Sequence, residues 1–262
     1  INRISFGLQS SIEEELKALG RIHTYKGFLQ SYQLAREFGF TNINVDLMSG
    51  LPYQTIDSYK TTLKRVCELK PEHISAYSLI IEPGTPFFDK YGSGEETALL
   101  PDENEDRIMY AITKAVLKEH GYERYEISNY AKPGRECRHN IGYWTGVSYL
   151  GLGVGASGYV MNRRFHVEGD YKKYMSIKMQ QDITPLYCDI EELDTKANME
   201  EFMFLGLRLT RGVSRHEFNE KFGVDMFEVF DRQIKRNMML KLMEYNSPNL
   251  RLTEKGLDLS NM

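Results

Sequence analysis

Apolar positions along residues 1–130 follow two alternating patterns. In 3–9, Ile4, Phe6 and Leu8 alternate with small or polar residues, a period of two that is typical of a β-strand. Other stretches have the apolar spacing of amphipathic helices, three of them ending at a glycine. These patterns predict strands at 3–9, 42–48, 73–81 and 122–127, and helices at 12–19, 25–38, 56–69 and 103–120.

Cap residues mark the start of two of the predicted helices. Thr55 is a plausible N-cap, and Asp57 follows it in the first turn, where a negative charge is favourable. Asp102 and Glu105 have the spacing of a capping box before the helix at 103–120. Strands that alternate with such helices form βαβ units, so we expect a parallel sheet, as a barrel or a doubly wound sheet. Functional groups then lie at the C-terminal ends of the strands.

The pattern changes in the second half of the chain. Residues 131–169 are rich in glycine and aromatic residues, which indicates a structured loop with a short strand. From Thr195 the pattern is helical, with a capping box at 214–217 and a long amphipathic helix at 226–243. Leu250–Leu252 resembles a β wing. Helices followed by a small hairpin predict a winged-helix-like module.

Composition and charge narrow the class of protein. The chain has 262 residues, of which 41% are hydrophobic, an ordinary value for a globular protein, and it lacks the long apolar run of a membrane span. The net charge of -4 provides no overall attraction to nucleic acid or anionic lipid. Three separated cysteines are typical of the reducing cytoplasm. Because Ile1 opens directly into a strand pattern, we interpret the chain as truncated or partly ordered, with domains at 1–181 and 182–262.

Several polar residues lie at or near the ends of the predicted strands. Gln9 ends the first strand, Asp46 lies near the end of the second, and Arg21 follows the first short helix. Each could have a structural role, as a cap, a partner of loop backbone or a surface charge. Together they could bind a zwitterionic ligand, because an arginine fork suits a carboxylate and an aspartate suits an ammonium or ribose hydroxyls.

Five short segments carry a more specific pattern. They are N-R-I-S-F-G-L-Q-S at 2–10, L-G-R-I-H at 19–23, N-V-D-L-M-S-G-L-P-Y-Q-T at 44–55, P-E-H-I-S-A-Y-S-L at 71–79 and E-P-G-T-P at 82–86. Taken together, they resemble the oxygen-independent coproporphyrinogen III oxidase-like family of radical S-adenosylmethionine (SAM) proteins. The resemblance implies an α/β fold, a partial (β/α) barrel with a C-terminal helical, winged-helix-like domain.

The resemblance also implies ligand-binding residues. Gln9, Arg21 and Asp46 fall where the family binds SAM, Tyr77 falls near the adenine, and Ile80 falls at a further SAM contact.

The family's [4Fe–4S] cluster is held by a C-x3-C-x2-C loop, and this sequence contains no such triplet. We expect that loop, and the family's glycine-rich SAM loop, to lie upstream. By itself, the chain is therefore expected neither to hold the cluster nor to cleave SAM.

A further segment separates the branches of the family. It reads E-I-S-N-Y-A at 126–131 and G-R-E-C-R-H-N-I-G-Y-W at 134–144, and its H-N-x-x-Y-W motif resembles the haem-chaperone branch. His139 offers an imidazole for haem iron, with Asn140 beside it, and Tyr143 and Trp144 offer flat faces to a macrocycle. Alternatively, His139 and Asn140 hold loop backbone and Trp144 fills the core. Cys137 is a second possible iron ligand.

Three functions follow from these observations. The first is a haem chaperone that transfers haem to haem-accepting proteins, with SAM and the cluster serving the full-length protein. The second is an anaerobic coproporphyrinogen III dehydrogenase, which decarboxylates two propionates through a SAM-derived radical. The third is a DNA-binding regulator that uses the winged-helix-like tail. Residues 182–262 contain 15 acidic and 11 basic residues, a net charge of -4, whereas a DNA-binding module shows a basic face.

Overall fold

The computed structural model describes residues 1–92, 94–177 and 183–260. These residues divide into two compact units, Ile1–Cys137 and Arg138–Met262, each with its own hydrophobic core. The predicted domain boundary between residues 181 and 182 touches the part of the chain that is not described and stays a prediction.

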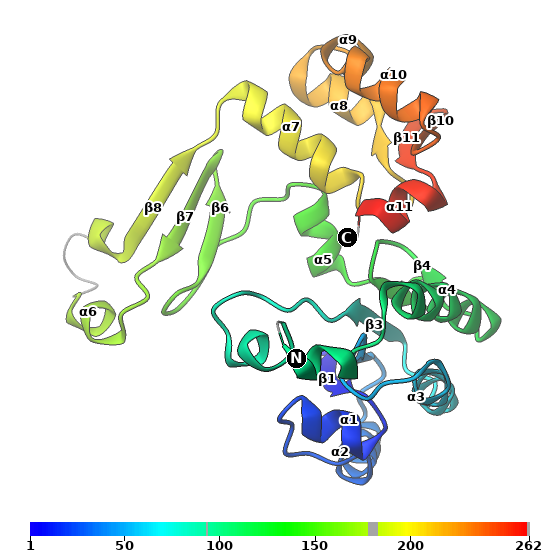
Figure 1. Ribbon diagram of the computed structural model, residues 1–262. Coiled ribbons are helices and arrows are strands. Elements are labelled where there is room, and N and C mark those ends of the chain that lie inside the picture. Colours follow the sequence, from blue (N-terminus) through cyan, green and yellow to red (C-terminus); the bar gives the residue numbers. More distant parts are fainter. Residues whose placement is uncertain (93, 178–182, 261–262) are drawn as a thin grey trace. The chain divides into compact units, whose positions relative to one another are not determined.

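The first unit is built around a five-stranded sheet (Figure 1), in which the strand order is β1-β2-β3-β5-β4. The strands are β1 (Ile4–Gln9), β2 (Ile43–Ser49), β3 (His73–Ser78), β4 (Glu123–Arg124) and β5 (Asn129–Ala131). The helices are α1 (Glu13–Ala18), α2 (Tyr25–Glu37), α3 (Ile56–Glu68) and α4 (Glu103–Glu119), with short helical turns η1 (Phe88–Gly92) and η2 (Glu95–Leu99). The predicted α/β class is confirmed.

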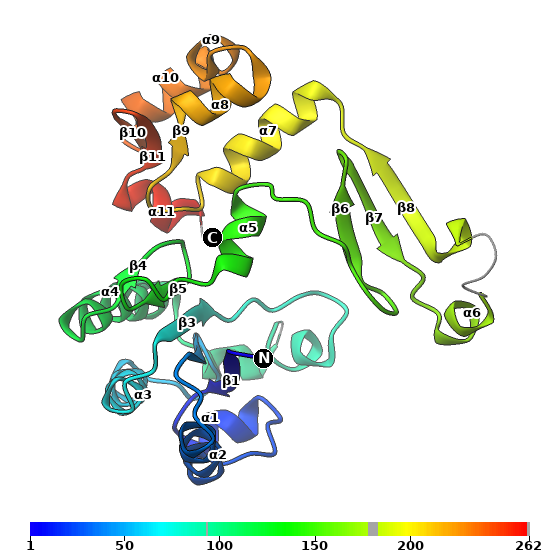
Figure 2. The ribbon, with the colours of Figure 1, turned by 180° about the vertical axis from the view of Figure 1, so that it is seen from behind.

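One face of this sheet carries the hydrophobic core. Leu8, Val45, Leu47 and Ile74 are fully buried and pack against apolar side chains of α2, α3 and α4. The helices lie along this face in both views of the ribbon (Figures 1 and 2). Strands β1, β2 and β3 pair in parallel, as the βαβ pattern predicts. Because the helices cover this one face, the opposite face of the sheet can carry polar side chains.

Both predicted helix caps of this unit are present. The Asp102 carboxylate accepts the Glu105 backbone N–H at 2.8 Å, while the Glu105 carboxylate accepts the Asp102 N–H at 3.0 Å. Thr55 and Ser58 make the same reciprocal pair at the start of α3. Such caps stabilise a helix by about 1 kcal/mol because they satisfy backbone donors that have no partner inside the helix.

The strand predicted at 122–127 is wrong in its extent. Only Glu123–Arg124 is a strand, and the chain then reverses into β5, which pairs antiparallel with both β3 and β4. The Glu126 carboxylate holds this reversal by accepting the backbone N–H of Ser128 at 2.9 Å and the Asn129 side-chain amide at 2.5 Å. Strand β5 is thereby inserted between β3 and β4.

The second unit combines two small antiparallel sheets with short helices. The first sheet consists of β6 (Ser157–Val160), β7 (Arg163–Val167) and β8 (Tyr187–Glu192), and the second of β9 (Val213–Ser214), β10 (Met243–Asn246) and β11 (Asn249–Leu252). The helical elements are α5 (Arg138–Trp144), α6 (Tyr171–Ser176), η3 (Thr184–Leu186), α7 (Thr195–Gly206), α8 (Arg215–Phe222), α9 (Met226–Val229), α10 (Asp231–Met239) and α11 (Glu254–Ser260). Among the described residues, no helix is both long and apolar enough to span a membrane.

Helices α8 to α10 and the β10–β11 hairpin form the predicted winged-helix-like arrangement (Figure 1). Of the capping box expected at 214–217, the structure shows the Ser214 half, whose hydroxyl accepts the Glu217 backbone N–H at 3.2 Å. Phe218, Met226, Ile234 and Leu250 form the core of the module.

Two expectations for this unit are corrected. The helix predicted at 226–243 is interrupted at Phe230, whose backbone is not helical, and Met243 belongs to β10, where it pairs with Leu252. Residues 131–169 contain α5 as well as two strands. Gly142 and the aromatic residues of α5 have low helix propensity, which explains why the sequence shows no helix there.

Candidate functional site

The sheet face opposite the core of the first unit carries a row of polar side chains. Strand register places Ser5 beside Asn44, and Asn44 beside His73. The Asn44 amide donates to Asp46 Oδ1 at 2.7 Å and to the Ser5 hydroxyl at 2.6 Å, and that hydroxyl lies 3.2 Å from Asp46 Oδ2. Asp46 is thus held on this face by side chains from two strands. We call this surface the polar face.

Gln9 lies on the same face as Asp46. It ends β1 with a φ of 67° at an irregularity of the β1–β2 pairing. Its Nε2 is so close to Gly7 that an added Cβ there would lie only 3.2 Å away, and Gly7 is the register partner of Asp46. Gln9 Oε1 is buried and has no hydrogen-bond partner within the described parts of the chain. An acceptor in this state fits a ligand that brings a donor.

The other residues predicted to bind SAM are placed less closely together. Tyr77 lies two residues after Ser75 along β3, on the polar face; burial raises its pKa, although a hydrogen bond with Ser75 lowers it. Ile80 follows the end of β3 and is 76% exposed. Arg21 is exposed in the connection between α1 and α2. The structure therefore gathers Gln9, Asp46 and Tyr77 on one face and places Arg21 and Ile80 in exposed connections.

The sequence did not single out two further buried residues beside this group. Glu126 and Asn129 are 1% and 3% exposed, and both influence the pKa of Tyr77. Asn129 is the register partner of Ser75, and its Oδ1 is buried without a hydrogen-bond partner among the described residues. The reversal at Glu126 brings them here, so a strand prediction could not show it.

In the second unit, α5 presents the predicted haem-binding residues. His139 is exposed, and among the described residues it makes no hydrogen bond. The edge-to-face ring contact with Tyr143, one helical turn later, has a centroid distance of 4.7 Å. Asn140 and Trp144 are partly buried, and the Arg208 guanidinium lies 4.4 Å from the Trp144 ring centroid. His139 therefore does not hold loop backbone, whereas Trp144 is packed as the structural alternative supposed.

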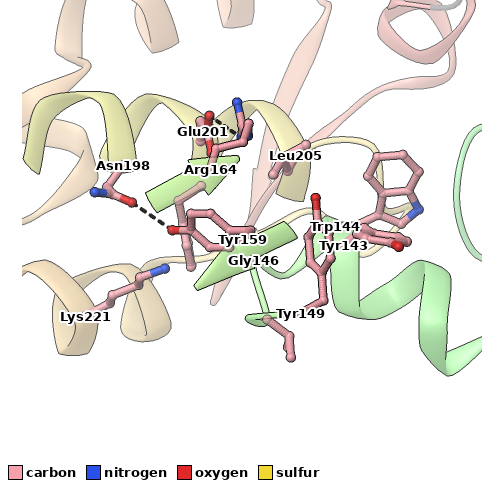
Figure 3. A pocket seen from close by; sticks show the side chains of 12 residues that line it. Tyr143, Trp144, Gly146, Tyr149, Tyr159, Arg164, Asn198, Glu201, Leu205 and Lys221 are labelled. Carbon is pink, nitrogen blue, oxygen red and sulfur yellow. Dashed lines mark hydrogen bonds and ion pairs between the residues drawn. The ribbon is translucent and has the colours of Figure 1, made fainter. Parts of the chain in front are cut away.

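A pocket of about 290 Å³ lies next to α5 in the second unit (Figure 3). Its lining residues come from α5, the following loop, β6, β7, α7 and α8: Tyr143, Trp144, Gly146, Val147, Tyr149, Tyr159, Arg164, Asn198, Glu201, Phe202, Leu205 and Lys221. Most of the walls are aromatic or aliphatic, with polar groups at one side.

The polar groups of this pocket are mostly paired. Arg164 forms an ion pair with Glu201 at 2.6 Å, and the Tyr159 hydroxyl donates to Asn198 Oδ1 at 3.0 Å (Figure 3). Burial raises the pKa of Tyr159, so this phenol is neutral at physiological pH. Lys221 extends from α8 toward the same side of the pocket (Figure 3).

The described residues do not fit an iron–sulfur cluster. No group of three or more His, Cys, Asp and Glu side chains among them could hold a metal ion. Cys67 is buried, and burial raises its pKa to about 12, which keeps it a neutral thiol. Cys137 and Cys188 are partly buried and form no disulfide with another described cysteine.

Comparison with known proteins gives consistent results. A family model described as the HemN C-terminal domain matches residues 193–259, which include α7 to α10 and most of α11. The chain is 38% identical over 261 residues to the heme chaperone HemW of Bacillus subtilis, a match that covers 100% of this chain and 68% of that protein. It is 36% identical over 261 residues to HemW of Lactococcus lactis, covering 100% and 67%.

A solved structure shows the same fold. Coproporphyrinogen III oxidase (HemN) of Escherichia coli, described as a radical SAM enzyme, matches with a TM-score of 0.80 at 24% identity, over 100% of this chain and 63% of that one. At this identity the likeness shows the fold alone, a partial barrel of the radical SAM type, as predicted. The chain spans about two thirds of the length of the HemW proteins it matches. It belongs to the radical SAM family of HemN-like proteins and, within that family, to the branch of the heme chaperones named HemW.

Proposed function

We propose that this chain binds haem and delivers it to haem-accepting proteins, a role supported by its relatives, which are named heme chaperones. The observation that carries this proposal is the imidazole of His139, which is exposed on α5 and makes no hydrogen bond within the described parts of the chain. An imidazole in this state can bond directly to haem iron.

The rings around His139 suit a flat, apolar cargo. The edge-to-face contact with Tyr143 restricts the imidazole, and such aromatic pairs contribute about 0.5–1.5 kcal/mol. Tyr143 in turn contacts Tyr149 edge-to-face at 4.7 Å. This run of rings favours an apolar macrocycle beside α5. Asn140 and Trp144 complete the motif on the same helix.

The polar face of the first unit supports a second part of the proposal, binding of SAM. Gln9 Oε1 would accept from the ammonium group of SAM, Asp46 would accept from the ammonium or the ribose hydroxyls, and Tyr77 would lie against the adenine. Arg21 would pair with the carboxylate, and Ile80 would provide an apolar contact. In radical SAM proteins, SAM and a [4Fe–4S] cluster together supply radical chemistry. Cluster ligands are not found among the described residues.

The test is a titration with haem under reducing, anaerobic conditions. The protein should bind haem with a Soret spectrum of an imidazole-ligated iron, and His139→Ala should change that spectrum or weaken binding about tenfold or more. His216→Ala is the matched control, because His216 is also exposed and lies on the second unit. A His139→Ala protein that folds normally and keeps both spectrum and affinity would return His139 to a structural role, and Cys137→Ala would then be tested.

Oxidative decarboxylation of coproporphyrinogen is supported only by likeness to the HemN fold at 24% identity. Incubation of reconstituted full-length protein with coproporphyrinogen III separates the two functions. Haem binding without loss of propionate carboxyl groups is the expected result, and turnover of the porphyrinogen would favour the oxidase.

A further inference from the structure

The pocket beside α5 contains a cation, Lys221, that forms no ion pair with a carboxylate of the described residues. Lys221 lies in the last turn of α8, with its Nζ 5.2 Å from the Phe202 ring centroid and 5.4 Å from that of Phe222. No described carboxylate forms an ion pair with it, and Glu201, the acidic residue lining the pocket, is bonded to Arg164. Burial lowers the pKa of Lys221, and Glu201 offsets this in part. A bound anion would therefore stabilise the charged form of Lys221.

The rest of the pocket limits what that anion can be. At about 290 Å³ the cavity is at the lower end of the range of roughly 300–1,000 Å³ that is usual for ligand pockets. It is thus suited to one end of a larger ligand. Tyr143, Tyr149 and Tyr159 form its walls, and a flat apolar group packs well against such rings. The anion is therefore expected to be attached to a flat apolar body.

The pocket is connected to His139 by ring contacts. Tyr143 contacts His139 on one side and Tyr149 on the other, with centroid distances of 4.7 Å in both cases. Tyr149 is followed by Tyr159, at 6.4 Å. Since Tyr143 lines the pocket, a macrocycle whose iron is bound by His139 would present its edge to this cavity.

We propose that this pocket receives the carboxylate-bearing edge of haem, with Lys221 Nζ paired to a propionate and Tyr143 and Tyr149 packed against the ring edge. The inference rests on the proposed haem-binding function and adds the group that recognises the propionates. It assigns to α8, an element of the HemN C-terminal domain match, a role in binding the cargo. Arg164 is not expected to contribute a free charge, because Glu201 neutralises it.

The experiment compares haem with its dimethyl ester, in which both propionates are neutral. The unaltered protein should bind haem about tenfold more tightly than the ester, since a partly desolvated ion pair of this kind is worth about that factor. Lys221→Met should remove this preference, because it should lower the affinity for haem about tenfold. The affinity for the ester and the Soret spectrum that depends on His139 should stay unchanged. Lys221→Arg should restore the preference.

Lys235→Met is the matched control, because Lys235 is an exposed lysine on α10 whose surface ion pair lies outside the pocket. It should keep the full preference for haem over the ester. If the Lys221→Met protein prefers haem over the ester as strongly as the unaltered protein does, Lys221 does not bind a propionate. That result would leave the haem-binding function intact. Failure of the unaltered protein to bind either porphyrin would overturn the proposed function itself, and the assignment with it.

Discussion

The Nε2 atom of His73 lies 2.8 Å from the hydroxyl of Tyr125, in the interior of the first unit. The other ring nitrogen of His73 is 2.6 Å from Asn44 Oδ1. Because the Asn44 Nδ2 group donates to Asp46, its Oδ1 must face His73, so His73 Nδ1 carries the proton and Nε2 accepts from Tyr125. The Tyr125 oxygen also accepts the backbone N–H of Cys137 at 3.3 Å. A continuous set of hydrogen bonds therefore joins the Asp46 carboxylate to the residue that precedes α5.

This arrangement predicts a pH dependence of stability. His73 is fully buried, and burial lowers its pKa from 6.5 to about 3. The unfolded chain binds the proton more readily, so the contribution of His73 is complete above its unfolded pKa and is lost as the pH falls from 6.5 toward 3. Between pH 7 and pH 5 the loss should be about 2 kcal/mol.

Urea denaturation at pH 7, 6 and 5 checks this prediction. A His73→Gln variant should be less stable at pH 7 but should lose about 2 kcal/mol less between pH 7 and pH 5 than the unaltered protein. His120→Gln is the control, because His120 is exposed at the end of α4. Parallel pH profiles for the His73→Gln and unaltered proteins would show that His73 is not the titrating group.

Glu15 should be important for stability although its neighbour is not. Its buried carboxylate accepts hydrogen bonds from Ser10 at 2.5 Å, Gln54 at 3.1 Å and Ser58 at 2.5 Å. Glu15→Ala leaves these buried donors without an acceptor and should lower the free energy of unfolding by about 3 kcal/mol. The adjacent Glu14 is exposed, and Glu14→Ala should change it by less than about 0.5 kcal/mol. Denaturant titration of both variants is the measurement, and equal effects would contradict the role of Glu15.

Binding of SAM should depend on the charge of Asp46. Asp46→Asn retains the shape of the side chain but removes the negative charge that the proposal places near an ammonium or ribose group. We expect SAM affinity, measured by equilibrium dialysis, to fall about tenfold, an effect of about 1.4 kcal/mol. Asp89→Asn changes an exposed carboxylate on η1 and should leave the affinity unchanged. If both variants bind SAM like the unaltered protein, Asp46 is not part of the site.

The hydroxyl of Tyr159 should contribute to the stability of the pocket wall. It donates to Asn198 Oδ1 at 3.0 Å, and Asn198 is only 7% exposed. Tyr159→Phe leaves this buried oxygen without its hydroxyl donor and should destabilise the protein by about 1–2 kcal/mol. Tyr171→Phe is the control because Tyr171 is largely exposed. Chemical denaturation of both variants measures the difference. A Tyr159→Phe protein as stable as the unaltered protein would show that the hydrogen bond to Asn198 is dispensable.

The sequence was informative wherever structure depends on neighbouring residues. The N-cap at Thr55 and the capping box at Asp102 form as predicted, because each joins a side chain to a backbone N–H only three residues away. The period-two apolar pattern at 3–9 correctly predicts β1, in which Leu8 faces the core, and the same alternation in β2 places Val45 in the core and Asp46 on the polar face. Such alternation requires no knowledge of the partner strand.

Errors occurred where distant residues decide the conformation. Met243 continues an amphipathic pattern, yet it pairs with Leu252 across the hairpin and becomes part of a strand. The residues after Arg124 read as a continuing strand, but β5 pairs with β3 and forces the chain to reverse. In both cases, backbone hydrogen bonds to another strand outweigh a local preference, which no short window of sequence can show.

By itself, the sequence determined the family, the α/β class and the presence of His139, Tyr143 and Trp144 in one motif, because these depend on residue identity and spacing. Only the tertiary structure decided that the His139 imidazole is exposed and makes no hydrogen bond with the described residues, and that Lys221 lies at the pocket that includes Tyr143. These two side chains are far apart in the sequence, and their common surroundings follow from the packing of α5, α7 and α8. Packing of this kind depends on side-chain shape and long-range contacts, which periodicity and composition do not encode.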